Sequence, residues 1–190
     1  VGEAGEHIVL ERILRILPEA RVPLGPGDDA AVLATPDGRV VITNDTMIEG
    51  PDFRAVWSGG ADLGAKAVAT NLADIAAMGA MPTGLVIALV LPEHTPLEWV
   101  EDFARGVASR AEGVCPVIGG DLATGPVRMI SVTALGDLSG RQPVRRDGAR
   151  AGDRLALAGS AGRAAAGLHL LFAVDPDSQD PTAVERLRGA

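Results

Sequence analysis

Residues 60–80 constrain the fold more than any other stretch, because they combine many small residues with a narrow polar stripe. The stretch reads GADLGAKAVATNLADIAAMGA, and its alanine content predicts a helix. Lys66, Thr70 and Asp74 recur every four residues, with Asn71 beside them, so they share one helix face. Because the other faces are small or apolar, we predict a buried helix whose polar stripe faces a partner. A solvated polar face is the competing interpretation.

The elements around this helix alternate between helices and strands. Apolar residues at helical spacing predict further helices over 6–17, 95–111 and 163–174. Short apolar or β-branched runs predict strands over 30–34, 40–43, 84–91, 117–121, 127–135 and 154–158. The run at 84–91 is continuously apolar, which is typical of a central strand. The order α-β-β-α-β-α-β-β up to residue 140 predicts an α+β (mixed α/β) fold.

Acidic residues stand next to several of these elements. The candidates are Asp28 and Asp29 after a Gly-Pro-Gly turn, Asp45, Asp74, Asp121 and, less clearly, Asp137. A hairpin of 30–34 with 40–43 would bring Asp29 and Asp45 to the same end of the ladder. Adjacent carboxylates in an apolar setting are relieved by a cation, so we predict a polycarboxylate site for Mg²⁺ or Mn²⁺. The competing interpretation is that these aspartates form turns and helix caps.

A basic loop complements these acids. Arg141, Arg145, Arg146 and Arg150 crowd a glycine-containing stretch of an otherwise acidic chain and form a candidate phosphate clamp. The standard glycine motifs do not fit: Gly25-x-Gly27-x-x-Ala30 precedes a strand, and 59–66 lacks the Gly-Lys-Ser/Thr core. Carboxylates with arginines predict metal-assisted phosphate chemistry without either motif.

Composition excludes some classes of binding partner and indicates a compartment. The net charge of −8 disfavours nucleic acid and anionic membranes, and 3% aromatic residues argue against base stacking. The longest apolar run, 85–91, is far shorter than the ~20 residues of a membrane span. The single cysteine, Cys115, excludes a disulfide framework within the chain, which fits a reducing cytoplasm. Its apolar surroundings predict a core residue rather than a nucleophile.

Five blocks of sequence together resemble the thiamine-monophosphate kinase family. They are GPGDDAAV at 25–32, TNDTMIEG at 43–50, KAVATNLADIAAMGA at 66–80, GGD at 119–121 and RxGAxxGD at 146–153. This family belongs to the superfamily of aminoimidazole ribonucleotide synthetase and selenophosphate synthetase. The resemblance implies ATP- and Mg²⁺-dependent phosphorylation of thiamine monophosphate to thiamine diphosphate. It also implies a homodimer whose sheets join across an interface near the active site.

The resemblance assigns roles to matching positions. The implied Mg²⁺ ligands are Asp29, Thr43, Asp45, Asp74 and Asp121, with Asn44 and Asp28 close by. Gly120, Asp121 and Arg146 would contact ATP. The family transfers the phosphoryl group directly to the substrate phosphate, so the implied charge stabilisation comes from metals and arginine rather than from a nucleophilic side chain. Residues 1–140 would form the metal- and ATP-binding, dimerising domain, and 141–190 a linker and the start of a second domain.

Two departures from the family pattern bear on activity. Asp52 precedes Phe53 where the kinase pattern usually has a substrate-contacting histidine, so Asp52 becomes the candidate substrate residue. The family's later Ser-Asp-Gly segment and most of its second domain are missing from these 190 residues. We therefore expect this chain alone to be inactive or nearly so. The alternatives are another ATP-dependent synthetase of the superfamily, or a non-catalytic module that dimerises and binds nucleotide.

Overall fold

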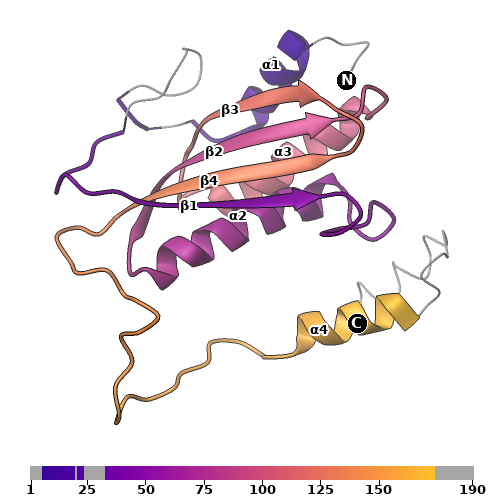
Figure 1. Cartoon of the computed structure of the whole chain (residues 1–190). Coiled ribbons are helices and arrows are strands. Elements are labelled where there is room, and N and C mark those ends of the chain that lie inside the picture. The colour runs from indigo at the N-terminus through magenta and orange to yellow at the C-terminus, as the bar shows by residue number, and fades with distance from the viewer. Residues whose placement is uncertain (1–5, 20, 24–32, 174–190) are drawn as a thin grey trace.

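A four-stranded sheet with two long helices against one face forms the body of the chain (Figure 1). The structure is a computed structural model that describes residues 6–19, 21–23 and 33–173. The order of elements is α1 (Glu6–Ile16), β1 (Val41–Ile48), α2 (Gly60–Ala77), β2 (Met81–Leu91), α3 (Leu97–Ala111), β3 (Val117–Thr124), β4 (Met129–Asp137) and α4 (Arg163–Ala173). The predicted α+β fold class is confirmed. No helix of the described part is long and apolar enough to cross a membrane.

The strands lie in the order β1-β4-β2-β3, so the first and third strands along the chain occupy the two edges. β4 pairs antiparallel with both β1 and β2, whereas β2 and β3 are parallel. β2 is an inner strand, as its apolar run predicted. In one row across the sheet, Asp45 pairs with Val132, Val132 with Ile87, and Ile87 with Gly120.

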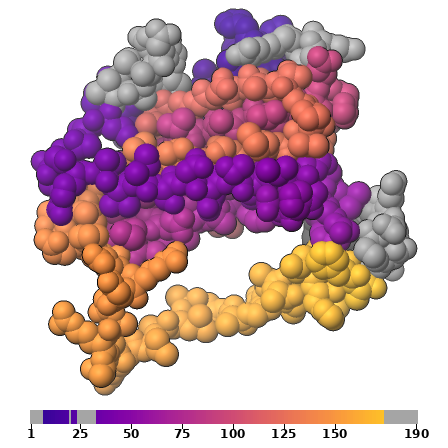
Figure 2. Space-filling view, viewed as in Figure 1, coloured from indigo at the N-terminus to yellow at the C-terminus, as the bar shows by residue number. Residues whose placement is uncertain are grey.

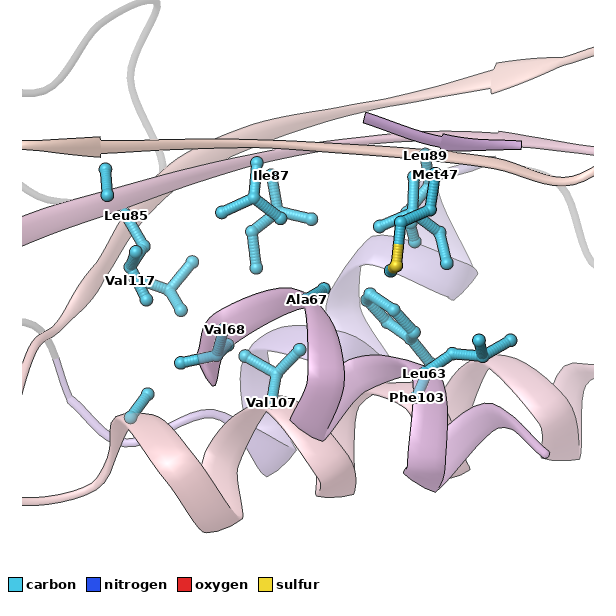
Figure 3. Packing of buried hydrophobic residues seen from close by; sticks show 14 of the residues in the cluster. Met47, Leu63, Ala67, Val68, Leu85, Ile87, Leu89, Phe103, Val107 and Val117 are labelled. Carbon is cyan, nitrogen blue, oxygen red and sulfur yellow. The ribbon is translucent and has the colours of Figure 1, made fainter. Parts of the chain in front are cut away.

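Strict alternation gives the sheet one apolar face and one open face. Along β4, every second residue from Ile130 to Gly136 is buried, and the residues between them are half-buried. Figure 3 shows apolar side chains from the strands, such as Leu85 and Ile87, directed toward Val68 of α2 and Val107 of α3. Because strand side chains alternate, the opposite face carries polar residues along β1 and β4.

Close backbone contact joins α2 to α3. A methyl group on Gly64 would come within 2.2 Å of the carbonyl oxygen of Phe103, and one on Gly106 within 2.1 Å of the carbonyl oxygen of Ala61. Gly60 meets the carbonyl of Trp99 in the same way. Helices normally pack 8–10 Å apart, and glycine permits the closest approach. α2 ends at Ala77, and Gly79, two residues farther on, has a φ of +72°, the left-handed conformation that glycine favours after a helix.

α1 completes the packed body beside α3. Val9 is fully buried, and Leu10 and Ile13 pack against the core. The Arg12 guanidinium donates to the Glu101 carboxylate at 2.7 Å, which links α1 to α3. The helix that the sequence predicted over 6–17 is confirmed.

The predicted hairpin of 30–34 with 40–43 lies mostly outside the described residues, because 30–32 are not described; of the first strand only Leu33 and Ala34 are described, and they are not in a strand. A second prediction of local structure is wrong. Residues 154–158 form no strand either, and Leu155 and Leu157 are exposed. A strand needs a neighbour for its backbone hydrogen bonds, and the described structure offers 154–158 none.

After β4 the chain leaves the body, and α4 comes back to the edge of the body (Figure 2). The first part of this stretch is tied down: the Val144 amide donates to the Met78 carbonyl at 3.0 Å, and Gly140 donates to Asp37 at 3.1 Å. Farther on, the ring of Phe172 in α4 lies edge-on to that of Trp57, with 5.0 Å between the ring centroids. The guanidinium carbon of Arg54 lies 4.5 Å from the centroid of the Trp57 ring. We call Arg54, Trp57 and Phe172 the aromatic clasp.

Candidate functional site

Oxygen donors meet where β1 runs alongside α2. The Thr43 hydroxyl of β1 donates to Asp74 Oδ2 of α2 at 3.0 Å. Asp45 lies two residues farther along β1, so it projects from the same face as Thr43, and both side chains are half-buried. The structure thus brings together Thr43 and Asp74 and places Asp45 beside them, on the side of β1 that faces α2.

The loop after β1 is held by its own polar groups. Asp52 Oδ2 accepts the Ile48 amide at 2.8 Å, and the Asp52 amide donates to the Ile48 carbonyl at 3.0 Å. Glu49 binds the Arg128 guanidinium through both carboxylate oxygens at 3.1 Å, and Arg128 lies over the Trp99 ring at 5.1 Å. The carboxylate of Asp52, the candidate substrate residue, therefore closes the loop against the backbone.

Lys66 connects this loop to α2. Its ammonium donates to the backbone carbonyl of Asp52 at 3.4 Å. Together with the Thr43–Asp74 contact, this shows that α2 runs antiparallel to β1, with Asp74 at the start of β1 and Lys66 at its end. We call this line of residues the β1–α2 seam: Thr43, Asp45, Asp52, Lys66 and Asp74. Sequence reasoning placed Lys66 on the polar stripe but gave it no role, although Lys66 is the only lysine in the chain.

The polar stripe itself is more exposed than the sequence predicted. Lys66 and Asp74 are exposed, whereas Leu63, Val68 and Ile75, on the other side of α2, are buried. The Thr70 hydroxyl donates to carbonyls of its own helix, that of Lys66 at 3.1 Å and that of Ala67 at 3.2 Å. The prediction of a buried helix is therefore wrong for this face, although both ends of the stripe do contact β1 or the loop after it.

Asn44 lies on the opposite face of the sheet from Thr43 and Asp45. Its side-chain amide donates to Thr133 Oγ1 at 2.9 Å and to the Val132 carbonyl at 3.1 Å. These contacts tie β1 to β4 across the open face. Strand alternation explains the separation, because adjacent residues of β1 must point to opposite sides.

Gly120 and Asp121 lie at the other edge of the sheet. They belong to β3, and β4 and β2 separate this strand from β1. At about 4.8 Å per strand, three steps place β3 roughly 14 Å from β1. Asp121 pairs with Ala88, Ala88 pairs with Ser131, and Ser131 pairs with Thr46. Asp121 therefore lies in the same row as Thr46, whose side chain is on the open face. Within one copy of the chain, the sheet therefore separates Asp121 from Asp45 in both distance and face.

Arg146 lies in an exposed turn after the anchored part of the 139–162 stretch. Its neighbour Arg145 forms a two-point ion pair with Asp147, with N···O distances of 2.8 and 2.9 Å. The hydrogen bond from Val144 to Met78 places the start of this arginine loop at the C-terminal end of α2, one turn beyond Asp74. The candidate phosphate clamp therefore begins near the C-terminal end of α2, and the described contacts of its arginines are local rather than to Asp74.

Only part of the predicted carboxylate cluster belongs to the described residues. Asp28 and Asp29 lie outside the described residues. Among the residues that are described, no group of three or more His, Cys, Asp or Glu side chains gathers in metal-binding geometry. The seam nevertheless offers only hard oxygen donors near Asp74, the Thr43 hydroxyl and the carboxylates of Asp45 and Asp74, and such donors fit Mg²⁺.

Cys115 is a core residue, as predicted. It is buried in the core cluster, and burial raises the pKa of its thiol to about 12. At neutral pH the thiol therefore stays protonated and is a poor nucleophile.

The part of the chain that forms the sheet and its two covering helices matches a known domain family. Residues 27–138 match the family described as "AIR synthase related protein, N-terminal domain". The chain belongs to this family, which confirms the superfamily that the sequence blocks indicated.

Similar proteins and solved structures include several thiamine-monophosphate kinases. Thiamine-monophosphate kinase of Mycobacterium tuberculosis is 43% identical over 170 residues, covering 88% of this chain and 51% of that protein. The crystal structure of thiamine-monophosphate kinase from Stenotrophomonas maltophilia K279a superposes with a TM-score of 0.76 at 37% identity, covering 87% of this chain and 52% of that one. A structure of AaThiL complexed with AMPPCP and TMP superposes with a TM-score of 0.67 at 30% identity, over 98% and 59% of the two chains. The chain spans about half the length of the relatives it matches.

Proposed function

We propose that this chain is part of a kinase that transfers the γ-phosphoryl group of ATP to thiamine monophosphate. The observation that carries the proposal is the Thr43–Asp74 contact beside Asp45, because it gathers oxygen donors from sequence blocks shared with the kinase family. The 43% identity to a thiamine-monophosphate kinase supports the same activity. A related structure complexed with AMPPCP and TMP supports ATP and thiamine monophosphate as the ligands.

Magnesium belongs to this proposal through the chemistry of the donors. Thr43, Asp45 and Asp74 would hold Mg²⁺, with Asp28 and Asp29 as further ligands. When bound, the metal would neutralise phosphate charge during phosphoryl transfer. Arg146 follows the anchor at the C-terminal end of α2, so it would bind the ATP phosphates near the same end of the seam.

A homodimer explains why Asp45 and Asp121 are separate within one copy. β1 and β3 are the edges of the described sheet, and Ile42 and Met81 are 64% and 60% exposed. Association of two copies can pair strand edges and bury exposed apolar side chains. Pairing β1 with β3 of a second copy would put Asp45 and Asp121 of different copies on neighbouring strands. Sedimentation equilibrium tests this, and a monomer throughout the micromolar range would contradict it.

Two further parts of the proposal concern organisation and compartment. Residues 1–140 would act as the metal- and ATP-binding domain, and 141–190 as a linker leading into a second domain. Limited trypsin digestion should then cut first between Arg141 and Arg163, and early cuts within the sheet would contradict the boundary. The single cysteine supports a reducing compartment, the cytoplasm, which fractionation of cells would check.

Calorimetry tests nucleotide binding by the 190-residue chain itself. Mg²⁺–AMPPCP should bind, and Asp45→Ala should weaken its affinity at least about tenfold, because removing a ligand of the charged metal complex costs more than ~1.4 kcal/mol. Asp102→Ala is the matched control: Asp102 lies on α3, pairs with Arg105 at 2.9 Å and should not affect binding. Equal binding by wild type and Asp45→Ala would exclude the seam as the metal site.

The reaction is tested in a version extended to the length of the kinases. Formation of thiamine diphosphate from thiamine monophosphate and ATP supports the kinase. Activity only in an aminoimidazole ribonucleotide or selenophosphate synthetase assay would assign another reaction of the superfamily. Nucleotide binding without any of these reactions would leave the non-catalytic module.

A further inference from the structure

We propose that Lys66 is the cation that binds a phosphoryl group at the Asp52 end of the β1–α2 seam. The proposal rests on the proposed function and extends it, because neither the sequence blocks nor the comparisons give Lys66 a role. Its ligand would be a phosphate group, and the structure places it away from the arginine loop.

The first argument is position. Lys66 and Asp74 lie on the same stripe of α2, eight residues apart, which is about 12 Å along the helix at 1.5 Å per residue. Asp74 contacts Thr43, and Lys66 contacts the loop after Ile48, so Asp45 lies between the two contacts. The seam therefore has oxygen donors at one end and a single ammonium at the other.

The second argument is that, among the described residues, the Lys66 head group has one hydrogen-bond partner and keeps donors to spare. Its contact with the Asp52 carbonyl is 3.4 Å, longer than the usual N–H···O distance of about 2.9 Å. An ammonium carries three N–H donors, and this contact uses one of them. The exposed side chain can therefore bind a phosphate oxygen while the loop still fixes where the charge lies.

The third argument concerns the loop that holds Lys66. Asp52 is tied to Ile48 in both directions, and Glu49 is tied to Arg128. The hydrogen bond from the Ile48 amide turns the Asp52 carboxylate toward the loop backbone, and Lys66 contacts the backbone carbonyl of Asp52 rather than its carboxylate. A rigid carbonyl beside a flexible lysine orients the ammonium before the ligand arrives, which lowers the entropy cost of binding.

The fourth argument is the chain's choice of cation. Arginine supplies sixteen of the seventeen Lys and Arg residues, and Lys66 is the exception. On an exposed helix face, lysine and arginine have nearly equal helix propensity, so helix formation does not account for the lysine. A compact ammonium acts as a point charge toward phosphate, whereas a guanidinium needs a planar two-point partner.

Amine footprinting tests the proposal on the unaltered 190-residue chain. Lys66 is its only side-chain amine, so acetylation at residue 66, measured by mass spectrometry, reports one site, and the α-amine is the internal control. Thiamine monophosphate, Mg²⁺–AMPPCP and unphosphorylated thiamine are added separately, at concentrations that calorimetry shows to be saturating. We expect thiamine monophosphate to slow acetylation of Lys66 about fivefold or more, and thiamine to have no effect.

The ligand arms identify the source of the phosphate. Protection by thiamine monophosphate alone assigns Lys66 to the acceptor phosphate, and protection by Mg²⁺–AMPPCP alone assigns it to the nucleotide. If calorimetry shows binding of both phosphate ligands and neither protects Lys66, the Lys66 assignment is overturned while the proposed function stands. If neither ligand binds, the proposed function fails together with it.

Two variants separate charge from geometry. Lys66→Met removes the charge at similar length and should lower affinity for the protecting ligand about tenfold, the usual cost of a charged hydrogen bond. Lys66→Arg keeps the charge but changes its shape, and it should recover only part of that loss. Arg110→Met on α3 is the matched control and should bind normally. Wild-type affinity in Lys66→Met, with an unchanged melting temperature, would overturn the proposal.

Discussion

The sheet with α2 and α3 differs sharply from the stretch that follows it. In the body, apolar side chains from strands and helices meet in one core, and Leu85 is completely buried (Figure 3). Beyond residue 138, Leu155 is fully exposed, and α4 buries none of its residues in the described structure. Both regions have apolar sequences, so the difference lies in their neighbours. Hydrophobic residues stabilise a fold only where a second element removes them from water.

The largest expected effect comes from leucines in the two regions. Leu85→Ala should lower the free energy of unfolding by about 3 kcal/mol, because it leaves a cavity in a packed core. Leu155→Ala should change it by less than about 0.5 kcal/mol, because no contact is lost. Urea unfolding followed by circular dichroism measures both. Similar losses in the two variants would show that residues 154–158 pack against the body in solution.

Glycines in helices give a second matched pair with a smaller effect. Gly106→Ala should cost about 2 kcal/mol, because its methyl group would press on the carbonyl of Ala61 and force α2 from α3. Gly167→Ala in α4 meets no atom within 4 Å, so it should favour the local helix by about 1 kcal/mol. Chemical unfolding reports the first and amide hydrogen exchange of α4 the second. A harmless Gly106→Ala would contradict the close contact of α2 with α3.

The smallest effect concerns the aromatic clasp, through which the two regions touch in the described structure. Phe172→Ala removes a ring from the aromatic clasp, an interaction of about 1 kcal/mol, so α4 should detach more often without loss of the body. In a Trp99→Phe background, fluorescence reports Trp57 alone, and its emission should move to longer wavelength. Leu168→Ala, also on α4 and exposed, is the control. Unchanged emission in Phe172→Ala would show that the clasp does not form in solution.

The sequence predicted the helices well and the strands less well, for a physical reason. A helix satisfies its hydrogen bonds locally, so periodic spacing located 6–17, 60–80 and 163–174. A strand depends on a partner distant in sequence, so 154–158 resembled a strand and formed none. The run at 84–91 succeeded because its continuous apolar character already required neighbours on both sides.

The candidate site was predictable in its chemistry but not in its layout. The residue types of Thr43, Asp45 and Asp74 indicated an oxygen-donor site, and the fold brings them to one seam. Local sequence patterns cannot predict that β3 lies at the far edge, because strand order is set by packing of the whole sheet. Asp121 was therefore expected beside residues from which two strands separate it. The sequence alone shows that Lys66 is the sole lysine, and this could have marked it as a candidate site residue.

The strand order also has a consequence for synthesis of the chain. β1 is the first strand made, yet its partner in the described sheet is β4, the last. Ribosomes add about 5–20 residues per second, so β1 waits roughly 4–16 s between completion of Ile48 and arrival of Met129. A strand waiting that long with free edges invites wrong partners. Thr43, Asn44, Asp45 and Thr46 make the middle of β1 polar, and polar residues in an unpaired strand disfavour aggregation, so Thr43 and Asp45 are suited both to metal binding and to protecting the nascent strand.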